Sequence, residues 1–245
     1  MRRLHRPALD SATFDFLAER AARVETTAGR PDFDIDGIWS AARKAVGMKP
    51  VVSALRGMTG RRERCMYCLD SHGTDIEHFW PKAPYPERAF SWPNMLLCCA
   101  ECGRHKLSQF PLYAAGAPLL IDPSAEQPWE YLDFDPETGN LTARFDRLAD
   151  EFIPKGKETV RVLHLDRREE ITEPRIEGWR RLSMLAAAYL NDPTTDLARD
   201  LWEADKYGLL DWGILGAGSV EEPFCRLKSQ FPGIWAQLHA RLIDG

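Results

Sequence analysis

Two cysteine pairs constrain this chain more than any other feature of its sequence. Cys65 and Cys68 form one C-x-x-C knuckle, and Cys99 and Cys102 form a second. Each knuckle lets two thiolates approach one ion at about 2.3 Å, as in tetrahedral zinc sites. Four thiolates complete the coordination of zinc, so we expect a structural ion and chemistry that lies elsewhere. Cys98 adjoins the second pair and is the alternative to Cys99 as a ligand.

The 245 residues are enough for one large domain or two small ones. Residues 1–60 are expected to be a helical segment, and residues 61–115 a zinc-bound core that is rich in Cys, Pro and Trp. A region this poor in long periodic segments needs an ion in place of a full hydrophobic core. Residues 116–245 are expected to form short strands and then helices, with a partner-binding surface as one use for them.

Within the middle region we expect short strands near 65–69 and 75–80 and a short helix near 100–107. The sequence of the third region predicts strands over 130–134 and 141–145. The turn between these two strands is Asp135-Pro-Glu-Thr-Gly-Asn.

The charge balance argues against a protein that coats nucleic acid, because the net charge is −5. Basic residues nevertheless gather beside the knuckles, with Arg64 before the first and Arg104 and Lys106 after the second. This distribution of basic residues suits contacts with a few phosphates, and a partner protein would supply the remaining contacts with nucleic acid. We find neither an apolar run that could span a bilayer nor a signal-peptide pattern, so a cytoplasmic protein without membrane contact is expected.

The segment between the knuckles carries residues that suit the cutting of phosphodiester bonds. His78 is a fitting general base because imidazole titrates near neutral pH. Glu77 offers hard oxygen ligands for Mg²⁺ or Mn²⁺, and Asn94 can hold a strand or orient His78 through its amide. Asp75 lies two residues before Glu77 and is either a supporting residue of the site or a turn cap.

These motifs together resemble a known family. The order C-x-x-C, D-x-E-H-F-x-P-K, W-x-N and C-x-x-C-x-x-x-K is similar to the HNH nucleases, which have a ββα-metal core. More narrowly, IEHFWPK and WPNMLLCCAECGRHK resemble the HNH subunit of Septu-type anti-phage systems and their retron-associated relatives. The resemblance runs from about residue 61 to 185.

The resemblance implies a role for each matching residue. His78 would activate water, Asn94 would position that base, and Glu77 would bind the catalytic divalent ion. Arg104 and Lys106 would contact phosphate. The partner implied is an ATPase of the ABC/SMC type. Separately, the aromatic residues of the C-terminal helices are expected to be mostly core, with docking of the ATPase or of a second copy of the chain as the alternative use.

One position departs from the family pattern. The family usually has Asn or His directly after the last knuckle as a second ligand of the catalytic ion, and this chain has Gly103. Water molecules could fill the gap, or Asp75 or His105 could replace the ligand, although His105 lies roughly 200° further around a helix. A nuclease that no longer cuts is the third outcome.

The sequence therefore predicts an α+β chain, mainly helical, with a small zinc-stabilised ββα-metal core and a few short strands after it. The expected function is that of a metal-dependent HNH endonuclease acting on nucleic acid, with DNA favoured, in anti-phage defence. A ribonuclease acting on a structured RNA such as tRNA is the alternative within this class. A zinc-stabilised adaptor with a weakened site is the alternative outside it.

Overall fold

The structure is a computed structural model that describes residues 1–244, apart from the side chains of Arg61 and Asp244. The chain divides into two compact units. We call Leu4–Pro118 the knuckle unit, and Met1–Arg3 together with the chain from Leu119 onward the C-terminal unit. The helices expected over residues 1–60 thus belong to the same unit as the cysteine knuckles.

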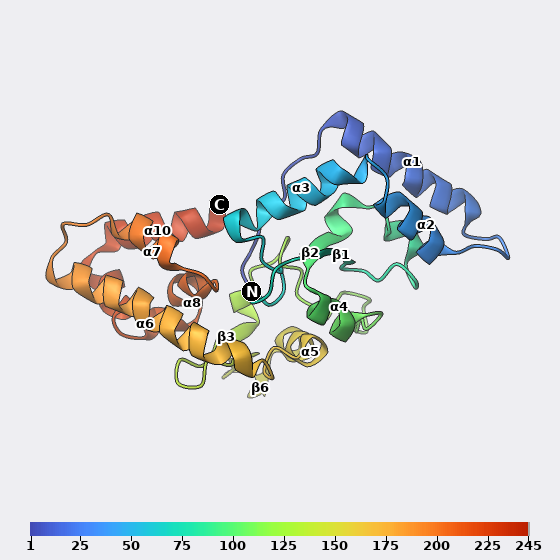
Figure 1. Ribbon diagram of the computed structural model, residues 1–245. Helices are drawn as coiled ribbons and strands as arrows, with labels where there is room; N and C mark the ends of the chain where they lie inside the picture. The colour runs from blue at the N-terminus through green and yellow to red at the C-terminus, as the bar shows by residue number, and fades with distance from the viewer. Residues whose placement is uncertain (245) are drawn as a thin grey trace. The chain divides into compact units, whose positions relative to one another are not determined.

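Three helices open the knuckle unit: α1 (Ser11–Thr27), α2 (Ile35–Arg43) and α3 (Met48–Met58). The Asp10 side chain caps α1 by accepting a hydrogen bond from the Thr13 amide at 2.8 Å. Helix α3 buries Met48, Val51 and Leu55, whose spacing gives one apolar face. Helix α1 packs against α3, and α3 packs against strand β2 (Figure 1). The N-terminal helices therefore form part of the core that supports the strands.

The expected ββα core is present. Strand β1 (Asp75–His78) pairs antiparallel with β2 (Met95–Cys98), and α4 (Ala100–Lys106) follows β2 directly. His78 lies opposite Met95 in the register. The short 3-10 helices of this unit are η1 (Gly60–Arg62), η2 (Pro86–Arg88) and η3 (Trp92–Asn94).

Two sequence expectations for this core need correction. The segment 65–69 is a turn and not a strand, because the Leu69 amide donates to the Cys65 carbonyl at 3.0 Å and Leu69 has a φ of 56°. A turn is what lets both thiols of a knuckle point to one side. The partner of β1 is instead β2, all four of whose residues are buried, so no polar alternation in the sequence marks it.

In its described residues, the C-terminal unit combines two small hairpins with six α-helices. Its described elements are η4 (Pro128–Glu130), β3 (Leu132–Phe134), β4 (Leu141–Ala143), β5 (Phe145–Asp146), β6 (Glu151–Phe152), α5 (Pro154–Leu163), α6 (Glu169–Asn191), α7 (Leu197–Ala204), α8 (Leu209–Leu215), η5 (Ala217–Val220), α9 (Phe224–Gln230) and α10 (Pro232–Asp244). Strands β3 and β4 pair across the expected turn, where Gly139 has a φ of 74°.

An aromatic cluster forms the core of the C-terminal unit. The Trp179 ring lies 4.7 Å from the Trp212 ring and 4.9 Å from the Phe224 ring, which joins α6, α8 and α9. Such pairs contribute about 0.5–1.5 kcal/mol each beyond their buried area. Arg2 forms ion pairs in this unit with Asp205 and Asp211. Among residues 1–244, no helix is both long enough and apolar enough to cross a bilayer.

Candidate functional site

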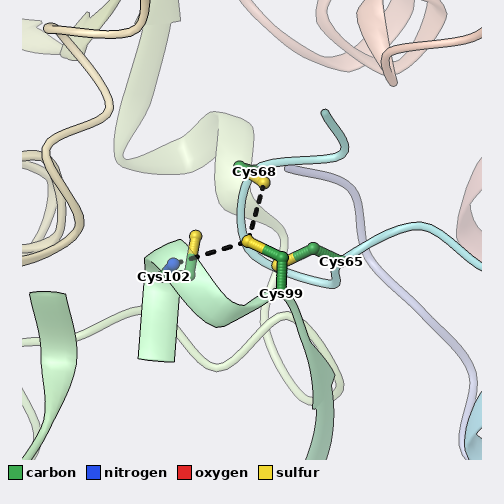
Figure 2. Close-up of side chains that lie close together, drawn as sticks. All are labelled: Cys65, Cys68, Cys99 and Cys102. Carbon is green, nitrogen blue, oxygen red and sulfur yellow. Dashed lines mark hydrogen bonds between the residues drawn. The ribbon is translucent and has the colours of Figure 1, made fainter. Parts of the chain in front are cut away.

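The four knuckle cysteines come together in one buried cluster (Figure 2). Their sulfur atoms all lie within 4.8 Å of one another, and Cys68 Sγ is 3.9 Å from Cys99 Sγ. Ligands placed about 2.3 Å from zinc at tetrahedral angles are about 3.8 Å apart, so the cluster has the dimensions of a zinc site. Within the described part of the chain, it is the one cluster of three or more His, Cys or acidic side chains close enough to hold an ion.

The backbone around the cysteines explains why the two pairs meet. The Met66 amide donates to the Leu97 carbonyl at 2.9 Å, which fixes the first knuckle against β2. The second knuckle lies at the start of α4, where Cys99 is the N-cap and accepts a hydrogen bond from the Cys102 amide at 3.4 Å. Cys98 Sγ instead donates to the Cys99 carbonyl, and it is Cys99 that belongs to the cluster of four sulfur atoms that could hold an ion.

The electrostatics of the cluster favour a bound cation. Burial raises the pKa of the Cys65 thiol, whereas the neighbouring thiol of Cys102 lowers the pKa of Cys99. Thiols bind zinc as thiolates, and several thiolates confined to one buried site repel one another unless a metal ion compensates their charge. The four cysteines can therefore hold a structural zinc ion, with no coordination position left for substrate.

His78 lies at the end of β1 with one ring nitrogen fixed by the backbone. Its Nε2 is 2.9 Å from the Ala89 carbonyl oxygen, which can only accept, so Nε2 carries the proton and Nδ1 is the basic nitrogen. The ring lies edge-on to Trp39 of α2, with centroids 4.3 Å apart, and His78 is 5% exposed. Burial lowers the pKa of His78 to about 4, and the charges of Lys82 and Lys106 act in the same direction. The imidazole is thus neutral near pH 7 and can accept a proton.

Asn94 organises the loop that supplies the Ala89 carbonyl. Its Oδ1 accepts from the Trp80 amide at 2.7 Å, and its Nδ2 donates to the carbonyls of Trp80 and Arg88 at 3.0 Å each. The side chain thereby joins the segment just after His78 to the segment that ends at Ala89. Any effect of Asn94 on His78 would run through this loop, because these three side-chain hydrogen bonds go to backbone atoms.

Glu77 lies on the other face of β1, against α4. Its Oε1 accepts a hydrogen bond from Lys106 Nζ at 2.8 Å, and the same ammonium donates to the His78 carbonyl at 2.7 Å. The Lys106 side chain is fully buried, whereas that of Glu77 is 18% exposed. Burial raises the pKa of Glu77, and the charge of Lys106 opposes that rise. Lys106 therefore pairs with a carboxylate here, and its expected phosphate contact stays a prediction.

Gly103 occupies the position where a second ligand was expected. A Cβ atom built there would lie 3.8 Å from Glu77 Oε2 and, apart from its chain neighbours and the backbone of its own helix, would meet no other atom within 4 Å. A side chain at this position would thus point toward the carboxylate, with room to fit. Among the described residues, Glu77 is the side-chain donor that faces this position, and such a donor would fit an ion held mainly by waters and a substrate phosphate.

Asp75 and His105 pair with groups other than Glu77, although Asp75 is close enough on β1 for its charge to raise the pKa of Glu77. Asp75 Oδ2 pairs with Arg43 at 3.0 Å, and His105 Nε2 lies 3.7 Å from Glu101 on the same helix. Arg104 is exposed on α4 and Arg64 is half-buried before the first knuckle, so their expected phosphate contacts stay predictions.

Two groups in the site escaped the sequence reasoning. The Ala89 carbonyl is a backbone atom, so no side-chain pattern could identify it. Trp39 lies in a helix that precedes the first knuckle, and its apolar spacing in α2 marks it only as a core residue. The contact between His78 and Trp39 requires the tertiary structure.

No protein-family model matches the chain. Over 122 residues, the chain is 30% identical to the Septu protein PtuB of Bacillus thuringiensis, and the match covers 46% of this chain and 40% of the relative. The two proteins are distant homologues. The match thus spans about two fifths of the length of this curated relative. The buried cysteine cluster beside the ββα core is consistent with a zinc-binding HNH-type site.

Proposed function

We propose that this chain is the HNH-type nuclease component of an anti-phage defence system and that it hydrolyses phosphodiester bonds in nucleic acid, with DNA favoured. Its similarity to a Septu protein supports the defence context. The single observation that carries the chemistry is the state of His78, a neutral imidazole whose Nε2 is fixed by Ala89 while Nδ1 stays basic.

In the proposed reaction, His78 Nδ1 accepts a proton from a water molecule as the water oxygen attacks phosphorus. The bond from phosphorus to the leaving oxygen then breaks, and that oxygen takes a proton from solvent. The Ala89 carbonyl holds the imidazole in the correct tautomer and stabilises the imidazolium that forms. Burial beside Trp39 keeps the ring neutral, and Asn94 keeps the Ala89 loop in place.

The divalent ion of this proposal is Mg²⁺ or Mn²⁺. Bound by Glu77 together with the substrate phosphate, it would neutralise the charge that develops on the phosphate and the leaving oxygen. Arg104 and Arg64 would add phosphate contacts. We also propose an ABC/SMC-type ATPase as partner, as the sequence resemblance implies. A net charge of −5 supports a need for a second protein to grip nucleic acid.

The test compares supercoiled plasmid and tRNA as substrates. Each is incubated with Mn²⁺, Mg²⁺ or EDTA, with or without the proposed ABC/SMC-type ATPase partner. We expect plasmid cleavage that EDTA stops and that His78→Ala abolishes at unchanged zinc content. His72→Ala is the matched control, because His72 is an exposed histidine that, like His78, lies between the two cysteine knuckles in the sequence. Cleavage of tRNA alone would move the proposal to a ribonuclease, and equal rates for His78→Ala and the parent would refute it.

The adaptor function is supported by a separate observation. Gly103 offers no ligand, and the carboxylate that it faces is already bonded to an ammonium. A chain of this kind would bind zinc and its partner but would not cut. Absence of cleavage by the parent under all these conditions, with cleavage appearing in Gly103→Asn, would favour the adaptor.

A further inference from the structure

We infer that the Lys106 ammonium is a built-in cation that occupies the catalytic ion position beside Glu77, so that a divalent ion binds the free protein only when this contact opens. The inference rests on the proposed function, because it concerns the ion of that same site. It adds a role for Lys106 that differs from the expected phosphate contact.

The first support is the arrangement of α4 over β1. Gly103 and Lys106 are three residues apart and lie on the same face of the helix, and both face Glu77. The position that could offer a ligand to an ion has no side chain. The next position on that face supplies a positive charge instead.

The second support is the way Lys106 is held. Its side chain has no exposed surface, and its ammonium donates to Glu77 Oε1 and to the His78 carbonyl oxygen. Carboxylate and carbonyl oxygens are also the ligands that a hard divalent ion selects. The ammonium thus occupies Glu77 Oε1 and the His78 carbonyl oxygen, and its charge repels a second cation.

The third support is that the two other candidates, Asp75 and His105, each pair with a group other than Glu77 or Lys106. Asp75 forms an ion pair with Arg43, and His105 lies near Glu101. Glu77 is the carboxylate that faces Gly103, so to bind the ion there it would have to exchange its ammonium partner for that ion. A phosphate that arrives with its own metal ion could bring about this exchange by giving Lys106 a new anionic partner.

The test measures Mn²⁺ binding to zinc-loaded protein in the absence of nucleic acid, from the electron paramagnetic resonance signal of free Mn²⁺. We expect weak binding by the parent and a fall of at least tenfold in the Kd for Lys106→Gln, which keeps hydrogen-bond donors but removes the charge. Lys49→Gln removes the same charge from an exposed position on α3 and should bind like the parent. Adding Glu77→Gln to Lys106→Gln should abolish the gained site.

The single variant Gly103→Asn distinguishes an ion site that is blocked by Lys106 from an ion site that merely lacks a ligand. The space at this position allows the variant to fold. With Lys106 in place, we expect its Mn²⁺ Kd to stay within about threefold of the parent. Tight binding by Gly103→Asn, or by the parent itself, would overturn the inference. Cleavage assays test the proposed function independently of ion binding. If the parent and its variants do not cut nucleic acid but Lys106→Gln gains a Mn²⁺ site, the inference is upheld and the proposed function is refuted.

Discussion

Lys106→Met measures how strongly the buried ion pair stabilises the knuckle unit. The substitution removes two charge-assisted hydrogen bonds, of 2.8 Å to Glu77 and 2.7 Å to the His78 carbonyl, and it leaves Glu77 without its partner. Removal of one partner from a buried pair typically costs 3–5 kcal/mol. The Glu77 side chain is 18% exposed and therefore partly solvated, so we expect a loss of about 3 kcal/mol, at the lower end of that range.

The assay is chemical unfolding followed by circular dichroism, with all variants saturated in zinc because bound zinc itself adds stability. Glu77→Gln and the double variant complete a double-mutant cycle. The double variant should be less destabilised than the sum of the single variants by about 1.5 kcal/mol or more, because it leaves no unpaired carboxylate. A Lys106→Met protein within about 0.5 kcal/mol of the parent, or additive effects in the cycle, would refute this account of the pair.

Other predictions address the zinc cluster and the base. One zinc ion per chain is expected by metal analysis; Cys68→Ser should lose it and unfold the knuckle unit, whereas Cys98→Ser should keep it. The pKa of His78 is lowered to about 4 in the folded state from an ordinary 6.5. Between pH 4 and pH 6.5 the unfolded state therefore binds more protons than the folded state. The contribution of His78 to the free energy of unfolding is thus fully present above pH 6.5 and is lost as the pH falls to 4. That contribution is about 3 kcal/mol, and urea unfolding of His78→Gln across this range should lack the corresponding slope. In Trp39→Ala, an NMR titration should show the pKa of His78 moving up toward 6.5, and an unchanged value would contradict burial as its cause. Asn94→Ala removes three partly buried hydrogen bonds and should cost about 2–4 kcal/mol in urea unfolding while slowing cleavage. If stability and cleavage rate are both unchanged, Asn94 does not hold the Ala89 loop.

The sequence predicted the parts of this protein that depend on local spacing. The C-x-x-C spacing placed Cys65 and Cys68 on one knuckle, and the short helix after the second knuckle lies where expected, as α4. The turn from Asp135 to Asn140 also formed between its two strands, since its residues favour that backbone geometry.

The parts that depend on long-range contacts were not predictable in this way. Strand β2 is buried on both faces, so its residues show no alternation that a sequence could reveal. The pairing of Lys106 with Glu77 depends on how α4 lies over β1. If α4 lay at a different angle to β1, the same lysine would face solvent. Trp39 reaches His78 because the N-terminal helices pack into the knuckle unit, which their own sequence does not indicate.

The most direct test of the central claim is the initial rate of plasmid cleavage by His78→Ala and His72→Ala, measured at equal zinc content with Mn²⁺ and the partner ATPase present. We expect that His72→Ala cuts like the parent and that His78→Ala loses activity by at least 100-fold, because a general base has been removed. If His78→Ala cuts within a few-fold of the parent, His78 is not the base and the proposed mechanism is wrong.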